Sequence, residues 1–166
     1  MSISKSHALE FQRETSQTKL ILSRIPNEHL DYKPHPKSMS MQQLVSHIVE
    51  LHNWTRLVIE RDAFNFHTDY QPTNYNSIEE AIAALDQQLV DIAPLFDTLS
   101  DEEWMKPWKL AAGEHVITET PKAGALRFII ENHMYHHRGQ LSVYLRLLDL
   151  PVPGLYGPSA DDQQQA

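Results

Sequence analysis

His133 and His137 stand four residues apart in the segment HMYHHRGQ, which spans residues 133–140. Residues at positions i and i+4 share one face of an α-helix, so two imidazoles at this spacing can bind the same metal ion, as in the His-x-x-x-His helix of zinc proteases. The pair suits this chemistry only if the segment is helical and the shared face is turned toward the protein interior. The neighbouring apolar residues test both conditions.

The apolar residues around this pair recur at the spacing of an amphipathic helix. They are Leu126, Ile130, Leu141, Tyr144 and Leu148. With successive residues rotated by about 100°, His137 falls near the middle of this apolar face, His133 lies beside it, and His136 falls at its margin. We therefore predict His133 and His137 as inward metal ligands and name His136 as the candidate catalytic acid or base. Gln140, also on the inner face, is a candidate partner that fixes the tautomer of a ligating imidazole.

A third histidine, His47, faces the core side of a second predicted helix. The apolar residues on its side of the helical wheel are Leu44, Leu51, Trp54 and Val58. His52, about 140° away, is expected outside the core, and Glu50 is either exposed or a supporting partner of His47. Three inward imidazoles on two helices predict a three-nitrogen metal site with one coordination position left for water or substrate. The alternative is a set of core histidines that are satisfied by hydrogen bonds.

The other histidines and the tryptophans are not assigned to this site. Surface, turn or loop positions are expected for His7, His29, His35, His67 and His115. Core or lid positions are expected for Trp54, Trp104 and Trp108. The sequence has no phosphate-binding loop, hydrolase elbow or dinucleotide fingerprint. It also lacks the paired Glu-x-x-His motifs of di-iron carboxylate bundles, so one metal ion is favoured over two.

Long periodic segments and only five glycines predict an all-α fold, a four-helix bundle with long connecting loops. The expected helices span residues 6–25, 40–61, 77–96 and 121–149. Capping boxes at Ser40, Ser77 and Ser100 mark helix starts, and Thr120 is expected to cap the last long helix ahead of Pro121. Residues 108–119 are either loop or a small hairpin. Loops of this length at the ends of a bundle are where sites are commonly built.

Composition narrows the classes of function. The chain has 166 residues, 14 Lys and Arg against 22 Asp and Glu, a net charge of −8 and no cysteine. Nucleic acid is not expected as a partner, because no dense cationic stretch could follow a phosphate backbone. The absence of cysteine excludes thiolate nucleophiles and Cys-based zinc sites within the chain, so metal or thiol chemistry must use His, carboxylates or an external thiol.

Length and hydropathy predict one domain, residues 1–155, followed by a polar, mobile tail over residues 156–166. The first residues contain no apolar signal region, and no apolar run of 18 residues occurs. We therefore expect a cytoplasmic protein that does not enter a membrane.

These motifs make the chain similar to the DinB family. The resemblance rests on LVSHI at residues 44–48, on HMYHHRGQL at residues 133–141 and on VPGLYG at residues 152–157, and it covers nearly the whole chain. It implies a helical bundle with one divalent metal, commonly nickel or zinc, held by three histidines. The matching positions are His47, His133 and His137. It also implies a homodimer, and a relationship to enzymes that use a low-molecular-weight thiol in transfer or isomerisation reactions.

Three functional hypotheses follow. The first is a metal-dependent thiol S-transferase of stress or detoxification type, in which a metal activates a small thiol toward a small-molecule substrate. The second is a metal-dependent hydrolase that uses an activated water. The third is a non-enzymatic, stress-induced metal-binding bundle, which predicts a site closed by a fourth protein ligand.

Overall fold

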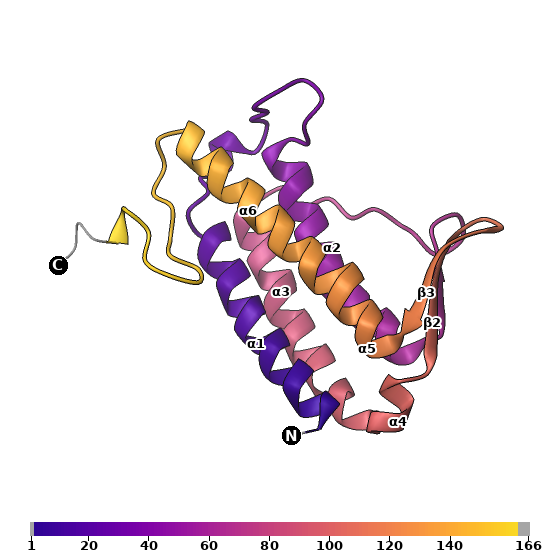
Figure 1. Cartoon of the computed structure of the whole chain (residues 1–166). Helices are drawn as coiled ribbons and strands as arrows, with labels where there is room; N and C mark the ends of the chain where they lie inside the picture. The colour runs from indigo at the N-terminus through magenta and orange to yellow at the C-terminus, as the bar shows by residue number, and fades with distance from the viewer. Residues whose placement is uncertain (1, 163–166) are drawn as a thin grey trace.

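The computed structural model describes residues 2–162, and most of them lie in helices that run side by side (Figure 1). The long helices are α1 (Ile3–Leu22), α2 (Met41–Glu60), α3 (Ile78–Ile92) and α6 (Asn132–Leu147). The shorter ones are α4 (Asp101–Trp104), α5 (Lys122–Ala125), the 3₁₀ segments Asn27–His29 and Ala93–Thr98, and the π-helical turn Leu126–Glu131. The prediction of a mostly helical protein is confirmed.

The capping residues predicted from sequence begin three of these helices. At α2, Ser40 Oγ accepts from the Gln43 N–H and the Gln43 side chain accepts from the Ser40 N–H, which completes a capping box. The Ser100 box at α4 is complete in the same way. At α3 only half of the box forms, because the carboxylate of Glu80 accepts from the Asn76 N–H instead. Pro94 ends the α-helical geometry of this segment, and the chain continues as the 3₁₀ segment.

The all-α prediction is wrong at one end of the molecule, where three short strands form a sheet. They are β1 (Ala63–Asn65), β2 (Pro107–Ala112) and β3 (His115–Pro121), with β1 parallel and β3 antiparallel to the central β2. Of the two alternatives for residues 108–119, the hairpin is correct, and Gly113 supplies the positive φ of 62° in its turn. Thr120 pairs with Trp108 in the sheet rather than capping a helix, so α5 begins at Lys122.

α2 and α3 run in the same direction, and residues 61–77 therefore return along α2 before α3 begins (Figure 1). The returning segment is fixed to α2 by hydrogen bonds. Tyr75 N–H donates to Ser46 Oγ at 3.0 Å, and Gln42 Nε2 donates to the Tyr75 carbonyl at 3.0 Å. The long connection is thus an ordered wall over one side of α2.

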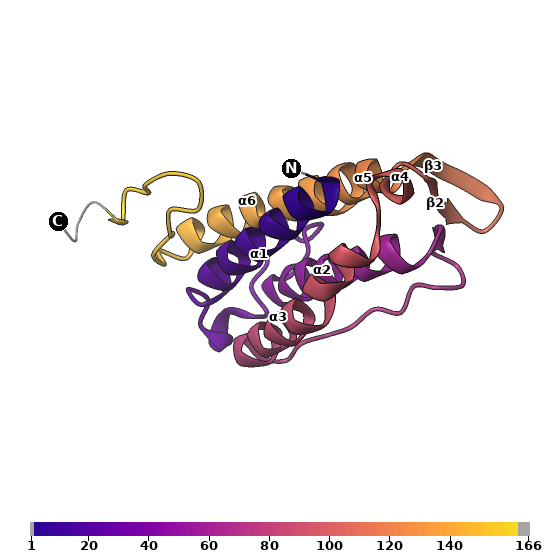
Figure 2. The ribbon, with the colours of Figure 1, turned by 90° about the horizontal axis from the view of Figure 1, so that it is seen from below.

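The core lies between the long helices, while the sheet and the C-terminal segment lie at opposite ends of them (Figure 2). The side chains that are almost completely buried include Ile21, Met41, Leu44, Ile48, Leu51, Leu85, Phe96 and Trp104. Part of the predicted mobile tail, residues 163–166, lies outside the described residues. Within residues 156–162, the Asp161 carboxylate accepts from Arg146 and from the Val152 N–H. None of the described helices is both long and apolar enough to cross a membrane.

Candidate metal centre

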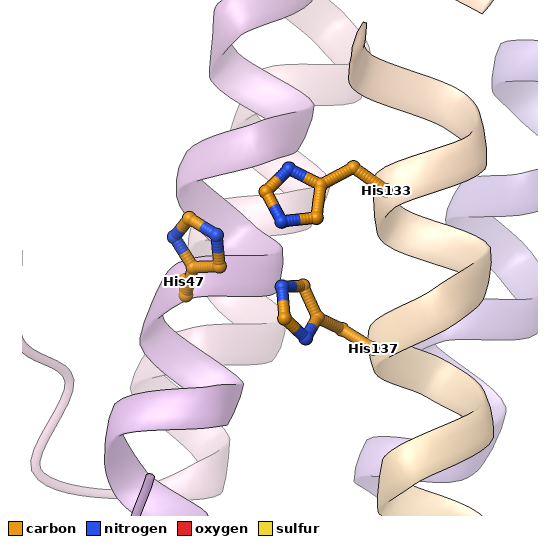
Figure 3. A group of neighbouring side chains, drawn as sticks. All are labelled: His47, His133 and His137. Carbon is orange, nitrogen blue, oxygen red and sulfur yellow. The ribbon is translucent and has the colours of Figure 1, made fainter. Parts of the chain in front are cut away.

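His47, His133 and His137 lie together between α2 and α6 (Figure 3). One ring nitrogen from each residue lies within 4.8 Å of those of the other two. The ring centroids are 5.0 Å apart for His47 and His133, 4.9 Å for His47 and His137, and 4.5 Å for His133 and His137. The structure therefore brings together the three residues that the helical periodicity and the family resemblance select.

The hydrogen bonding of His137 leaves one buried nitrogen without a partner. His137 is 7% exposed, and its Nδ1 lies 2.7 Å from the Gln140 side-chain oxygen. Because an amide oxygen can only accept, Nδ1 carries the proton and Nε2 keeps its lone pair. Nε2 is buried and has no hydrogen-bond partner among residues 2–162. A buried lone pair of this kind fits a metal ligand, and Gln140 holds the ring in the required tautomer.

The environment of the cluster keeps the imidazoles of His133 and His137 neutral. Burial, together with the neighbouring histidines, lowers the pKa of His133 to about 4. Burial also lowers the pKa of His137, although the hydrogen bond to Gln140 acts in the opposite direction. At pH 7 these rings therefore present lone pairs rather than protons, which is the state that metal binding requires.

Glu50 lies beside His47, which settles a question that the sequence left open. Its side chain is 8% exposed, and Oε2 lies 3.4 Å from His47 Nδ1. The carboxylate also accepts from the Thr73 N–H and, at 3.3 Å, from the Tyr70 hydroxyl. Burial raises the pKa of Glu50, but the hydrogen bonds from His47 and Thr73 outweigh it and the net shift is downward. Glu50 is thus an ionised support for His47.

A cavity of about 230 Å³ adjoins this pair on the side of the returning segment. Its lining includes Gln43, His47, Glu50, Tyr70, Thr73 and Asn74. No Lys or Arg lines it, so Glu50 supplies its only fixed charge. Tyr70 and Thr73 were not selected from the sequence, because nothing in a polar linker indicates which of its residues will fold back onto a helix. A small polar molecule can therefore approach His47 along a wall of hydrogen-bonding groups in which Glu50 is the charged member.

The remaining candidates lie around the cluster or away from it. His136 is exposed on α6, and its ring is 5.1 Å from that of His137, at the rim. His35 is an exposed loop residue, as expected, and its Nδ1 accepts from the Lys37 N–H. Trp54 stands edge-on to His47 with centroids 6.4 Å apart, while Trp104 and Trp108 are buried in the core.

Two histidines expected outside the core are buried. His52 is 1% exposed, and its Nε2 lies 3.1 Å from Thr18 Oγ1 of α1. The prediction was wrong because α2 is buried around most of its circumference, so a wheel with one inner face does not describe it. His7 is 9% exposed, where a surface position was expected. It stands four residues before Phe11 on the apolar stripe of α1, and this spacing was the available signal.

The fold and the site together define a mostly helical protein with a small sheet and a histidine cluster that could hold a metal ion. The chain belongs to the DinB family, whose family model matches residues 1–166.

Two uncharacterized proteins of Bacillus subtilis (strain 168) are similar in sequence. YrdA is 43% identical over 44 residues, a match that spans only 26% of each chain. YjoA is 27% identical over 151 residues, or 85% of this chain and 86% of YjoA.

Two solved structures share the fold. A DinB-like protein from Bacillus cereus ATCC 10987 aligns with a TM-score of 0.67 at 20% identity, covering 89% of this chain and 94% of the other. The B. subtilis DinB-like protein YjoA aligns with a TM-score of 0.66 at 21% identity, covering 89% and 96%.

Proposed function

We propose that this DinB-family protein is a metal-dependent thiol S-transferase of stress or detoxification type. The observation that carries the proposal is the cluster of His47, His133 and His137, in which the buried Nε2 of His137 has no partner among the described residues and His47 lines a cavity. A divalent metal held by these residues would lower the pKa of a bound thiol and so would supply a thiolate nucleophile at neutral pH. Because the chain has no cysteine, the thiol must be a small molecule.

The residues around the cluster have distinct roles in this proposal. Gln140 and Glu50 orient the rings of His137 and His47, which keeps their lone pairs directed at one point. The cavity wall formed by the returning segment receives the polar part of the thiol or of its electrophilic partner. His136, at the exposed rim, is placed to exchange a proton with solvent.

Hydrolysis is the second candidate, and Glu50 is the observation that favours it. A hydrolase needs a carboxylate or another base near the reacting water. Glu50 lies on the cavity wall, and its lowered pKa keeps the carboxylate ionised at neutral pH, which is the form that a general base needs. Activity that requires metal but persists without any thiol would assign the site to hydrolysis rather than to transfer.

The proposal also covers the setting of the site. We infer a four-helix bundle of α1, α2, α3 and α6 as the scaffold, nickel or zinc as the metal, a small-molecule substrate, a cytoplasmic location and a homodimer. Apolar side chains on the outer side of α6 support the dimer, since Val143 and Leu147 are exposed one helical turn apart. Light scattering on the purified protein would measure the mass of the particle directly.

Elemental analysis tests the site first. Untagged protein purified without chelator is expected to carry about one equivalent of transition metal more than His133→Ala or His137→Ala carries. His115→Ala, an exposed histidine in β3, is the matched control and should keep the metal. The loaded protein is then assayed with a panel of small thiols and a chromogenic aryl halide. Absence of metal, with no uptake on titration, would overturn the proposal, and so would failure to conjugate any thiol.

A further inference from the structure

A second cluster of possible ligand groups lies between α1 and the start of α6. His7 and Glu10 belong to α1, and Glu131 is the last residue of the π-helical turn that precedes α6. One ligand atom from each residue lies within 4.8 Å of the others. The cluster shares no residue with the three-histidine cluster, because it faces α1 while His133 and His137 face α2.

Two polar atoms of this second cluster have no hydrogen-bond partner among residues 2–162. Glu131 is 4% exposed and His7 is 9% exposed. Both atoms, His7 Nδ1 and Glu131 Oε2, are buried, and the cationic group near Glu131 Oε2 in the described part of the chain is Arg127, whose Nη1 lies 3.3 Å away without forming a hydrogen bond. Such atoms are rare in folded proteins, and each one indicates either a lost interaction or a ligand that completes it.

The spacing between His7 and Glu131 suits a shared ion better than a hydrogen bond. His7 Nδ1 lies 3.8 Å from Glu131 Oε1, which is beyond hydrogen-bond distance. Two ligand atoms on one ion, each bound at about 2.1 Å, can be up to about 4.2 Å apart. We propose that His7, Glu10 and Glu131 form a second cation site, which takes a divalent transition metal ion such as Zn²⁺.

The local backbone supports a special role for Glu131. A π-helical turn inserts one extra residue per turn and so changes which later residues face a neighbouring helix. Such turns are uncommon and occur frequently at functional sites. Here the turn covers Leu126–Glu131, and its last residue, Glu131, contributes a carboxylate to the cluster beside α1. The second cluster therefore combines an unusual backbone with incompletely satisfied side chains.

Arg127 sets the affinity of this site. Its guanidinium pairs with Glu10 through both terminal nitrogens, and Nη1 lies 3.3 Å from Glu131 Oε2. The Tyr135 hydroxyl also donates to Glu10, at 2.8 Å. Carboxylate oxygens have further lone pairs, so a metal ion can share them, but the positive charge of Arg127 opposes it. The Arg127 side chain is 40% exposed and can move toward solvent when the ion binds.

A nitrogen ligand with two carboxylates favours zinc or a similar transition metal over Mg²⁺ or Ca²⁺, which prefer oxygen alone. Binding would connect the first turns of α1 to the start of α6. Trp104 is a built-in reporter, since its ring lies 5.3 Å from that of His7. A paramagnetic ion such as Co²⁺ in this site is therefore expected to quench its fluorescence.

The experiment uses full-length His133→Ala protein, in which the three-histidine cluster is disabled. Calorimetric titration with Zn²⁺ at pH 7.5 should still show about one equivalent. Adding Glu131→Gln should weaken this binding at least tenfold, whereas Glu114→Gln, an exposed acid in the hairpin turn, should not change it. Arg127→Gln should strengthen it severalfold, and this gain cannot come from misfolding.

The same titrations separate this inference from the proposed function. Wild-type protein should bind one ion more than His133→Ala if both sites exist. Equal binding by the two proteins would overturn the three-histidine site alone. If His133→Ala binds no Zn²⁺, or if Glu131→Gln and Arg127→Gln leave its binding unchanged, the second cation site is wrong and Arg127 is the only cation that the carboxylates hold.

Discussion

Arg138 and His137 are neighbouring buried residues of α6 that face α1 and α2, and their polar groups find partners to different extents. Toward α1, Arg138 donates to the carboxylate and the carbonyl of Glu14, and its Nη1 lies 3.4 Å from Thr18 Oγ1. Toward α2, His137 uses one nitrogen on Gln140, while the other has no partner among the described residues. Arg138 therefore pairs its charge with Glu14, although its Nε has no partner among the described residues, whereas His137 retains a free lone pair.

The difference separates a structural network from a candidate binding site. Burying an ion pair is tolerable when each charge is matched, and Glu14 and Arg138 meet that condition from two helices. Burying a neutral imidazole costs less free energy than burying a charge. A buried ring nitrogen without a partner still loses the hydrogen bond that it made to water, unless a ligand binds to it. Arg138 directly follows His137 in sequence, so one turn of α6 contributes both to the ion pair with Glu14 and to the histidine cluster. The two sides should therefore respond differently to substitution.

The largest effect is expected on the α1 side. Arg138→Met leaves Glu14 buried without its counter-ion and should lower the free energy of unfolding by about 3–5 kcal/mol. Urea denaturation at pH 7 in the presence of a chelator measures this loss. The double variant Arg138→Met/Glu14→Gln should recover part of it, because the uncompensated charge is gone. A loss below about 1 kcal/mol would show that this pair is solvated and that the two sides do not differ.

The α2 side should lose binding rather than stability. Gln140→Leu removes the acceptor that fixes the His137 tautomer, and metal affinity should fall by about 10–100-fold. The free energy of unfolding of the metal-free protein should change by less than about 1 kcal/mol, since Gln140 is only partly buried. Gln140→Glu keeps an acceptor oxygen and should restore most of the affinity. Competition with a chromogenic chelator measures both variants, and unchanged affinity in Gln140→Leu would remove Gln140 from the site.

Local periodicity was sufficient to predict that three histidines of α2 and α6 come together. His133, His137 and His47 could be assigned because each one falls on a helix whose apolar face is visible in a short window of sequence. The caps at Ser40 and Ser100 were equally local, because each box closes within three residues. These features depend on nothing beyond one helix.

Features that depend on packing between distant segments were not predictable in this way. His52 is buried because α1 covers that side of α2, which no wheel drawn for α2 alone reveals. β1 has three residues and becomes a strand only by pairing with β2, more than 40 positions later. Glu50 lines a cavity because residues 61–77 return along α2 and cover it. In each case the deciding contact joins segments whose order along the chain says nothing about their distance in space.

A pH titration of stability sharpens the comparison further, because His52 belongs to the buried α1 side. Burial, with a smaller contribution from Arg138, lowers the pKa of His52 to about 3. An unfolded histidine has a pKa of about 6.5, so between these values the unfolded state binds one proton more and stability falls as pH falls. One such group contributes about 1 kcal/mol of lost stability between pH 6 and pH 5. His52→Gln should remove this part of the slope, whereas His115→Gln, which changes an exposed histidine, should leave it intact. Urea midpoints measured at both pH values give the pH dependence of stability for each protein. Identical slopes in wild type and His52→Gln would mean that His52 takes up protons in the folded protein, which contradicts its burial against α1.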